Sequence, residues 1–356
     1  MKRSLLPLSA PPKKICILRL SALGDVTHVI PLLRQIQTQW PECEITWICG
    51  KFEYKLLRLI ENVNFIEFDK KAGWSAYLGL RERLKLEQFD VLLHMQVAAR
   101  ANIASLMIKA KIRLGWDKKR SRDLHQMFVN HAVAEKSLQH QVDGFLSFGE
   151  ALGLPNKPPE WRLPVTDKAI HFVKQQVASD KPVLVISACS SHALRNWSAE
   201  GYARVADYAV EKYGYQVVLS GGPSEVELST AQNIESSMQH EVLNLVGKDT
   251  LEELLGLMQA ASVVISPDSG PAHIANAMGV PVIGLYACTW SKRSGPYNSL
   301  NLCVDKFDEA AEQFLKKSAS SLSWGSKIEK SGVMDLITVE DVCQKLDLVM
   351  KDLVSY

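Results

Sequence analysis

The sequence lacks several features that would assign it to a familiar class. Its seven cysteines form no Cys-x-x-Cys pair, and no group of cysteines and histidines has the spacing of a zinc site. The odd count and apolar surroundings of these cysteines indicate free thiols in a reducing cytoplasm. No apolar run approaches the ~20 residues that span a bilayer. The start, 1–12, is too proline-broken for a signal peptide.

An excess of charge of one sign is also missing. The 41 basic and 39 acidic residues leave a net charge of +2, whereas nucleic-acid-binding domains usually carry a strong basic excess. We therefore expect no nucleic-acid partner. Neither a Gly-x-Gly-x-x-Gly fingerprint nor a Walker A loop occurs, which disfavours dehydrogenases and P-loop enzymes. No Asp-x-Asp pair occurs that could hold a sugar nucleotide through a divalent metal, so we expect no metal and no cofactor.

What is present is a regular alternation of strand-like and helical segments over 356 residues, long enough for two domains. This alternation predicts an α/β fold with parallel sheets covered on both faces. In the first half we expect strands at 15–20, 44–49, 64–68 and 90–95, and helices near 26–39, 53–61 and 75–87. In the second half we expect strands at 182–188, 215–220, 242–246, 262–266 and 281–286, and helices near 199–213, 224–238, 250–260, 271–278 and 337–351.

A proline-rich stretch separates the two halves. Residues 153–164 contain four prolines, which cannot hold a regular element and mark a linker. The sequence therefore predicts a first domain over 1–160 and a second over 161–336.

A carboxylate follows the first strand directly. The apolar run 15–20 is succeeded by a turn with Ser21 and Gly24, then by Asp25 and a helical pattern. Asp is a common helix cap, because its side chain accepts from the free N–H groups of the first turn. The alternative is that Asp25 acts as a general base. Ligands bind at the carboxyl ends of strands in open α/β sheets, and an acid there can accept a proton from a bound hydroxyl.

A second junction of strand and helix has the composition of an anion site. The strand 262–266 ends before Asp268, Ser269 and Gly270, and His273 lies in the first turn of the next helix. Gly270 allows a close approach to the backbone, and the helix N-terminus attracts negative charge. The alternative is ordinary capping with His273 on the surface.

Two further loops follow strands of the same predicted sheet. Ser190, Ser191 and Arg195 come after strand 182–188, and a guanidinium is suited to phosphate. Glu225 follows a Gly-Gly turn and could accept from ribose hydroxyls, although an acid in a first helical turn is also ordinary. With the Asp268 turn, these loops could face one diphosphate.

The first half also contains a basic stretch. Residues 109–122 include seven Lys or Arg, among them Arg120 and Arg122, and Lys51 could extend the same face. The stretch is either a solvated loop or a site for an anionic acceptor or membrane surface, where each cation adds ~1 kcal/mol.

Together these residues resemble the ADP-heptose:lipopolysaccharide heptosyltransferases of glycosyltransferase family 9, over nearly the whole chain. That family begins with a strand and a Ser-x-x-Gly-Asp-x-x-His-x-x-Pro pattern, which here is Ser21, Gly24, Asp25, His28 and Pro31. It also carries an Asp-(Ser/Thr)-Gly-x-x-His turn, which here is Asp268, Ser269, Gly270 and His273.

The resemblance implies a GT-B fold, in which two Rossmann-like domains face each other across a cleft. The acceptor would bind the first domain and the nucleotide-sugar the second, and helix 337–356 would pack back on the first. Asp25 would be the general base of an inverting transfer that releases ADP. Arg195 occupies the position of a phosphate-binding lysine. The implied donor contacts are Ser190, Ser191, Arg195, Glu225, Asp268, Ser269, Gly270 and His273; the acceptor contacts are Ser21, Gly24, His28, Lys51, Arg120, Arg122 and His140.

The enzyme type that we expect is heptosyltransferase I. It would move heptose from ADP-L-glycero-D-manno-heptose to Kdo of Kdo-lipid A, without a metal, as a peripheral protein on the cytoplasmic face of the inner membrane. Three alternatives stay open: a heptosyltransferase of type II or III, a sugar-nucleotide 2-epimerase of the same architecture, and a non-catalytic nucleotide-sugar-binding protein. The basic stretch disfavours the epimerase, which needs no acceptor site.

Overall fold

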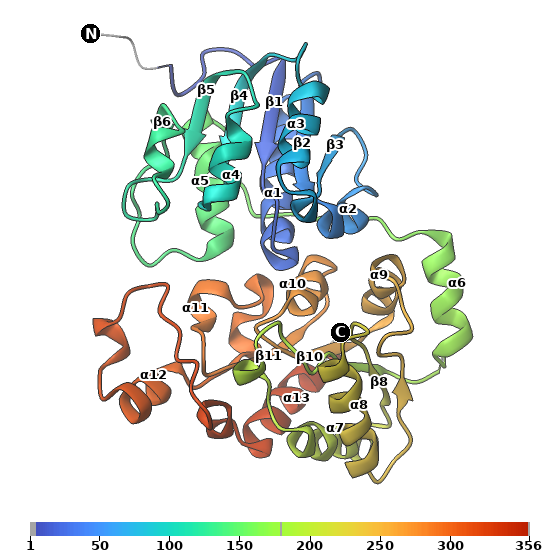
Figure 1. The fold of residues 1–356 in the computed structure, drawn as a ribbon. Coiled ribbons are helices and arrows are strands. Elements are labelled where there is room, and N and C mark those ends of the chain that lie inside the picture. Colours follow the sequence, from blue (N-terminus) through green and yellow to red (C-terminus); the bar gives the residue numbers. More distant parts are fainter. Residues whose placement is uncertain (1–4, 179, 355–356) are drawn as a thin grey trace. The chain divides into compact units, whose positions relative to one another are not determined.

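The structure, a computed structural model, describes residues 5–178 and 180–354. The chain forms two compact units, and the division falls between Leu163 and Pro164, at the end of the proline-rich stretch (Figure 1). The expected alternation of strands and helices therefore forms two separate sheets, one in each unit.

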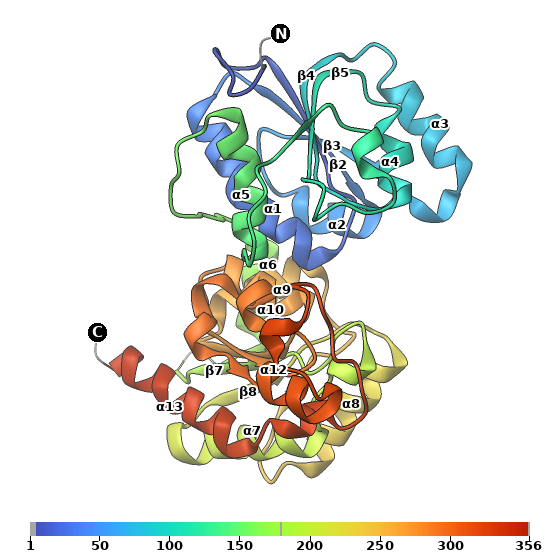
Figure 2. The same cartoon turned by 90° about the vertical axis from the view of Figure 1, so that its left-hand side faces the viewer.

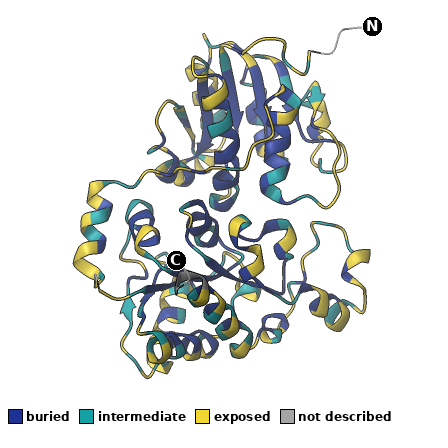
Figure 3. Cartoon of the chain, turned by 180° about the vertical axis from the view of Figure 1, so that it is seen from behind, coloured by how far each residue is buried: buried dark blue, intermediate teal, exposed yellow. Residues whose placement is uncertain are grey.

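The first unit is built on a six-stranded parallel sheet in the order β3-β2-β1-β4-β5-β6. Its strands are β1 (Lys14–Leu18), β2 (Glu44–Gly50), β3 (Asn64–Phe68), β4 (Phe89–His94), β5 (Ala110–Gly115) and β6 (His131–Ala132). Its helices are α1 (Leu23–Gln39), α2 (Lys51–Leu57), α3 (Trp74–Arg83), α4 (Ala99–Ser105) and α5 (Gln141–Leu152). The central strands are buried, as expected for a sheet covered on both faces (Figure 3).

The second unit has its own six-stranded parallel sheet, in the order β12-β11-β10-β7-β8-β9. Its strands are β7 (Val183–Ile186), β8 (Gln216–Leu219), β9 (Leu243–Asn244), β10 (Val263–Pro267), β11 (Val282–Tyr286) and β12 (Val304–Asp305). Its helices are α6 (Asp167–Gln176), α7 (Ala199–Tyr213), α8 (Glu225–Ser237), α9 (Leu251–Ala260), α10 (Gly270–Ala277), α11 (Ser291–Ser294), α12 (Phe307–Ala310) and α13 (Val339–Val354).

Both sheets have the same topology. Counted from the first strand of each unit, the order is 3-2-1-4-5-6, which is that of the Rossmann fold. The order reverses between β1 and β4 in one unit and between β7 and β10 in the other. Ligands of such sheets bind outside the carboxyl ends of the strands at this switch point. The loops after β1, β4, β7 and β10 are therefore where each unit can hold a ligand.

The basic stretch 109–122 contains a strand that the sequence analysis did not predict. Ala110–Gly115 forms β5 between β4 and β6, so the interpretation of this part as a solvated loop is wrong. The Arg113 side chain turns inward, and its guanidinium donates to the carbonyl oxygens of Phe128, Ile108 and Ser105. Charged residues within a strand mask the apolar pattern by which a strand is recognised.

The last helix packs on the second unit, contrary to the expectation that 337–356 returns to the first domain. Val342, Leu346 and Val349 recur at helical spacing and lie in the core of the second unit. Asp347 accepts hydrogen bonds from the hydroxyls of Tyr208 and Tyr213 of α7, each at 2.7 Å. Figure 2 shows α13 beside α7. Residues 355–356 of the expected range lie outside the described residues.

The proline-rich stretch has no helix or strand between residues 154 and 166, as expected, but much of it is held against the first unit. Trp161 is buried, and its indole N–H donates to the carbonyl oxygen of Thr27 at 2.9 Å. Arg34 Nε donates to the carbonyl oxygen of Trp161 at 3.0 Å. The segment therefore belongs to the fold of the first unit up to Leu163.

Candidate active site

Asp25 lies at the switch point of the first sheet. It is the third residue of α1, and its Oδ2 accepts from the backbone N–H of Ala22 at 3.1 Å. The same oxygen is 2.5 Å from Nη2 of Arg19. The side chain is 24% exposed, so the carboxylate is within reach of a ligand. Asp25 thus secures the first turn of α1 and keeps a partly exposed carboxylate at the switch point.

Arg19, which the sequence interpretation passed over, holds that carboxylate. It follows β1 directly, and its Nη1 donates to the carbonyl oxygen of Met95, just after β4, at 2.8 Å. Its guanidinium carbon also lies 5.3 Å from the centre of the Phe145 ring. The side chain is 12% exposed, so its position is well constrained. The position of Arg19, directly after a strand and six residues before Asp25, is the sequence feature that could have indicated this ion pair.

Ser21 and Gly24 occupy the turn before α1. Gln96, after β4, joins the two loops of the switch point: its Nε2 donates to Ser21 Oγ at 3.3 Å, and its Oε1 accepts from the N–H of Leu20 at 2.7 Å. Gly24 is buried, and its carbonyl oxygen accepts from Thr27 Oγ1 at 2.6 Å. Ser21 is therefore held against the loop after β4, while Gly24 serves the packing of the turn.

His28 and His140 lie together behind this turn. Their ring centres are 6.0 Å apart, and they are only 2% and 6% exposed. His140 is the N-cap of α5, and its Nδ1 accepts from the backbone N–H of Val142 at 3.1 Å. Both rings therefore contribute to the packing of α1 against α5 and offer little surface to an acceptor.

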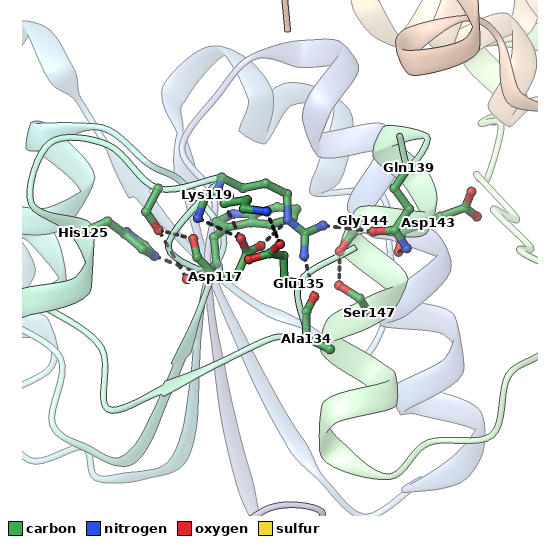
Figure 4. A network of polar contacts seen from close by, with 12 residues as sticks. Asp117, Lys119, His125, Ala134, Glu135, Gln139, Asp143, Gly144 and Ser147 are labelled. Atoms are coloured by element: carbon green, nitrogen blue, oxygen red, sulfur yellow. Dashed lines mark hydrogen bonds and ion pairs between the residues drawn. The ribbon is translucent and has the colours of Figure 1, made fainter. Parts of the chain in front are cut away.

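The Arg120 guanidinium is the centre of a network within the first unit. It forms an ion pair with Asp117 and donates to Gln139 Oε1 at 2.9 Å and to the Ala134 carbonyl oxygen at 2.8 Å. It also lies 4.9 Å from the Trp116 ring. The surroundings of these groups are shown in Figure 4. Arg120 therefore joins the loop after β5 to the start of α5.

Arg122 and Lys51 are exposed on the same unit. Arg122 Nε donates to the carbonyl oxygen of Val97, in the loop after β4, at 2.8 Å. Lys51 is the first residue of α2, and its Nζ is 4.0 Å from Asp69. Arg122 thus lies at the switch point, while Lys51 follows the neighbouring strand β2.

The switch point of the second unit brings an arginine and two acids together. Arg195, in the turn after β7, has its Nη1 3.5 Å from Oδ2 of Asp268, which follows β10. His273 Nε2 is 3.8 Å from Oδ1 of the same aspartate. Glu329, from far along the chain, accepts from Arg195 Nε at 3.0 Å and Nη2 at 2.6 Å. The sequence interpretation joined Arg195, Asp268 and His273 correctly but did not include Glu329.

These contacts determine the charge state of the two acids. Burial raises the pKa of Asp268, but the hydrogen bond and charge of His273, together with Arg195 and Thr289, bring it below its usual value. The hydrogen bond from Arg195 lowers the pKa of Glu329. Both groups are therefore carboxylates at neutral pH, and one guanidinium faces two negative charges.

The remaining donor-side residues line the same loops. Ser269 is the N-cap of α10, its Oγ lies 2.7 Å from Ser266 Oγ, and the helix begins at Gly270. Ser190 Oγ donates to the carbonyl oxygen of His192 at 2.9 Å, and Ser191 is exposed next to it. The two serines and the start of α10 thus follow β7 and β10, the two strands at the switch point.

Glu227, rather than Glu225, is turned toward the Gly-Gly loop. Its carboxylate accepts from the Gly222 N–H at 2.7 Å and from Ser224 Oγ at 2.6 Å. It also lines a pocket at the ends of β7 and β8, whose walls include Ile186, Leu219 and Val246. Glu225 is exposed on the first turn of α8. A glutamate at the third helical position after a serine cap was the missed signal.

Two kinds of feature are absent from the part of the chain that the structure describes. No helix within 5–178 or 180–354 is long and apolar enough to cross a membrane. Over the same part of the chain, no group of three or more His, Cys, Asp or Glu could hold a metal ion.

Comparison with known proteins identifies the family to which this chain belongs. The pattern that defines glycosyltransferase family 9 (heptosyltransferase) matches residues 77–324. The chain is 42% identical over 331 residues to the lipopolysaccharide core heptosyltransferase OpsX of Haemophilus influenzae, covering 93% of this chain and 95% of that protein. The matched residues 77–324 include the Asp268 motif.

Solved structures agree in fold. A glycosyl transferase of family 9 from Veillonella parvula superimposes with a TM-score of 0.78 at 21% identity, covering 96% of this chain and 97% of that one. Escherichia coli heptosyltransferase WaaC with ADP gives 0.68 at 20% identity, covering 85% and 99%. These likenesses confirm the GT-B type of fold. The matched family also decides against the epimerase and the non-catalytic binding protein, and the chain belongs to glycosyltransferase family 9, as an enzyme of the heptosyltransferase kind.

Proposed function

We propose that this enzyme transfers heptose from ADP-L-glycero-D-manno-heptose to Kdo of the lipopolysaccharide inner core, with Kdo-lipid A as acceptor. The support is the 42% identity to a lipopolysaccharide core heptosyltransferase over nearly the full length of both chains. The solved WaaC structure with ADP, which shares the fold, supports an ADP-linked donor. We retain heptosyltransferase I as the type, with types II and III as the alternatives.

The donor binds the second unit in this proposal. Its diphosphate would be held by Arg195, by the hydroxyls of Ser190 and Ser191, and by the start of α10 with Ser269 and Gly270, because helix N-termini attract anions. Asp268 and His273 would orient these groups. The adenosine would lie beside the Gly-Gly loop after β8, with Glu227 in place of Glu225 as the acceptor for ribose hydroxyls.

The acceptor binds the first unit, with Asp25 as general base. The Asp25 carboxylate would take the proton from an acceptor hydroxyl while that oxygen forms a bond to the anomeric carbon of heptose. The bond from that carbon to the diphosphate breaks, and ADP leaves from the opposite face, so configuration inverts. Ser21, Lys51 and Arg122 would contact the acceptor. His28, Gly24, Arg120 and His140 would act through the packing behind it, since three of them are buried and Arg120 is engaged in its network.

One observation carries the mechanistic proposal. Each unit has a charged cluster at its own switch point: Asp25 with Arg19 in the first, and Arg195 with Asp268 in the second. In both sheets this is the position where ligands of Rossmann-like folds bind. A base in one unit and a phosphate-binding cation in the other are the two parts that an inverting transfer needs.

The acceptor is lipid-linked in this proposal, so we also propose a peripheral location on the cytoplasmic face of the inner membrane. The outer face of α3 supports it: Trp74 is 72% exposed and Leu78 63% exposed, one helical turn apart. Exposed basic side chains lie on α3 and directly before and after it, namely Lys70, Lys71, Arg81, Arg83 and Lys85, and the one exposed acid of this helix, Glu82, is paired with Lys85. Aromatic and basic residues on one helix face are typical of contact with an anionic bilayer surface.

The direct test is incubation of the enzyme with ADP-heptose and defined acceptors, read by mass spectrometry. Kdo-lipid A with one Kdo, the same acceptor phosphorylated on Kdo, and a core already carrying one heptose would separate type I from types II and III. NMR of the new linkage would report whether configuration inverts. Absence of transfer to every acceptor would contradict the proposal.

The role of Asp25 is tested by Asp25→Asn, which keeps the size of the side chain and a hydrogen-bond acceptor for Ala22. We expect kcat to fall by about 10²- to 10⁴-fold, the usual contribution of a general base. ADP affinity should not change, because the donor contacts lie in the other unit. Asp90→Asn, at a carboxylate that accepts from the backbone N–H groups of Lys13 and Lys14, is the matched control and should retain transfer.

A further inference from the structure

Glu329 occupies an edge of the guanidinium that the donor diphosphate would use. Its Oε1 lies 3.0 Å from Nε and 2.6 Å from Nη2 of Arg195. These two nitrogens form one side of the planar fork that suits a phosphate or a carboxylate. A carboxylate from the protein therefore already lies where two donor contacts would form.

The charges around Arg195 make this contact more than a structural ion pair. Arg195 is a single cation, and Asp268 and Glu329 are both negative, with Asp268 Oδ2 3.5 Å from Nη1. Lys327 is a further cation close enough to lower the pKa of Glu329, so the two carboxylates already balance the charges of Arg195 and Lys327, and no excess positive charge remains for a ligand. A diphosphate would bring further negative charge to it. Since like charges at this range repel, one of the two acids must give way when the donor binds.

Glu329 is the acid that can move. Asp268 directly follows β10 and its side chain is only 15% exposed, held by His273 as well as Arg195. The Glu329 side chain is 26% exposed and has a second basic neighbour: its Oε2 lies 3.6 Å from Nε2 of His192, whose side chain is 45% exposed. A rotation of the side chain toward His192 would release the Arg195 fork.

The backbone beneath Glu329 is fixed, so a rotation of the side chain suffices. Ile328 is 1% exposed, and its N–H donates to the carbonyl oxygen of Cys288, just after β11, at 2.8 Å. Cys288 Sγ lies 2.9 Å from the carbonyl oxygen of Leu194, the neighbour of Arg195. The backbone next to Glu329 and the backbone next to Arg195 are thus joined through Cys288.

We propose that Glu329 is an internal anion that takes the place of a donor phosphate on Arg195 and is exchanged for it when ADP-heptose binds. The inference rests on the proposed function, because it takes Arg195 as the diphosphate ligand. It makes Glu329 a residue that sets nucleotide affinity: the carboxylate weakens binding of the donor and of the product ADP alike. The opposite role, positioning of Arg195 for the diphosphate, would have Glu329 strengthen binding.

The test is the affinity of the full chain for ADP, measured by isothermal titration calorimetry. Glu329→Gln keeps the shape and one acceptor oxygen but removes the charge. We expect ADP to bind about three- to tenfold more tightly, the size of effect that one partly exposed charge produces. Glu312→Gln removes the same charge from an exposed position in the region before Glu329 and should leave the affinity unchanged.

A double-mutant cycle with Arg195→Gln tests whether the effect passes through the guanidinium. In that background Glu329→Gln should change ADP affinity by less than twofold. Equal gains in both backgrounds, or unchanged or weaker binding in the single variant, would overturn the inference while leaving the proposed function intact. If the unmodified chain did not bind ADP at all, the proposed function would fail first, and the inference with it.

Discussion

Arginine–carboxylate pairs lie at the switch points of both sheets, and their surroundings give them different properties. Arg19 is held by the Met95 carbonyl oxygen and the Phe145 ring, and it meets one carboxylate, Asp25, that stays partly exposed. Arg195 meets two carboxylates, Asp268 and Glu329. In the first unit Arg19 therefore orients one partly exposed carboxylate, whereas in the second unit Arg195 is neutralised by two carboxylates.

A pair of buried histidines makes the first unit sensitive to acid. His94, at the end of β4, is 0% exposed, and its ring centre is 4.5 Å from that of His125. Burial, together with the charges of His125 and Arg113, lowers the pKa of His94 to about 3, and burial lowers the pKa of His125 to about 4. Both rings are therefore neutral in the folded protein at neutral pH.

The sign of the pH effect follows from these values. In the unfolded chain both histidines titrate near pH 6.5, so the neutral rings favour the fold fully above that pH, and the benefit is lost as pH falls toward 4 and 3. At pH 5 each histidine should cost about 2 kcal/mol of unfolding free energy. Urea denaturation between pH 5 and 7.5 checks this. His94→Phe should flatten the profile, whereas His171→Gln, at an exposed position, should not; a pH-independent profile for the unmodified chain would contradict the assignment.

At the scale of elements, loops between strands and helices carry the candidate site, and packed segments keep the loops in place. The Trp161 side chain anchors the end of the proline-rich stretch on α1, whose first turn holds Asp25. The helix α5 packs against the same α1 and begins at His140. The acceptor side of the proposed site thus depends on contacts made by segments more than a hundred residues later in the chain.

Removal of the Trp161 side chain should therefore destabilise the first unit. Trp161→Ala leaves a cavity and an unpaired Thr27 carbonyl oxygen, and buried Trp→Ala substitutions cost about 3–5 kcal/mol. Trp74→Ala deletes the same side chain at an exposed site and should cost under about 1 kcal/mol. Urea denaturation followed by circular dichroism measures both. Equal losses in the two variants would show that the anchor contributes nothing specific.

The outer face of α3 gives a second prediction at this scale. Trp74→Ser with Leu78→Ser removes exposed apolar area without touching the buried face at Leu80. Co-sedimentation with vesicles of phosphatidylcholine and 30% phosphatidylglycerol (a chosen composition, roughly that of an anionic bilayer) should fall several-fold. Leu124→Ser with Met127→Ser, also exposed apolar residues of this unit, is the control. Binding that is unaffected by the α3 substitutions would place membrane contact elsewhere.

At the scale of the whole molecule, the same Rossmann topology occurs twice, once in each unit. Each unit closes its own core around its own sheet, and α13 completes the second unit rather than the first. Two similar sheets with unlike residues at their switch points allow one chain to bind two unlike substrates. In our proposal the base lies in the first unit and the nucleotide contacts lie in the second, so a defect in the base should not affect nucleotide affinity.

A prediction about metal belongs to this scale, since it concerns the complete reaction. The sequence has no Asp-x-Asp pair, and in our proposal Arg195 and the start of α10 neutralise the leaving diphosphate. Transfer measured with excess EDTA should therefore retain most of its rate. Loss of turnover with EDTA, restored by added Mg²⁺ or Mn²⁺, would show that a cation is needed.

The sequence by itself determined the local features. Apolar runs and helical periods located β1 to β4 and β7 to β11, because a strand buried in a parallel sheet is largely apolar. The Ser21–Pro31 and Asp268–His273 motifs identified both strand–helix junctions, because short-range chemistry at a helix start is written in adjacent residues. The family followed from those motifs. Strands β5, β6 and β12 were not predicted: β6 and β12 have only two residues each, and Lys111 and Arg113 interrupt the apolar pattern of β5.

Only the tertiary structure decided what lies beside these motifs. Arg19 contacts Asp25, Glu329 contacts Arg195, and Glu227 rather than Glu225 turns to the Gly-Gly loop. It also decided that α13 packs on α7 and that Arg113 and Arg120 serve the fold. A side chain's partner across 134 residues depends on how loops and helices meet in space, and ion pairs between such residues leave no periodic signal in the chain.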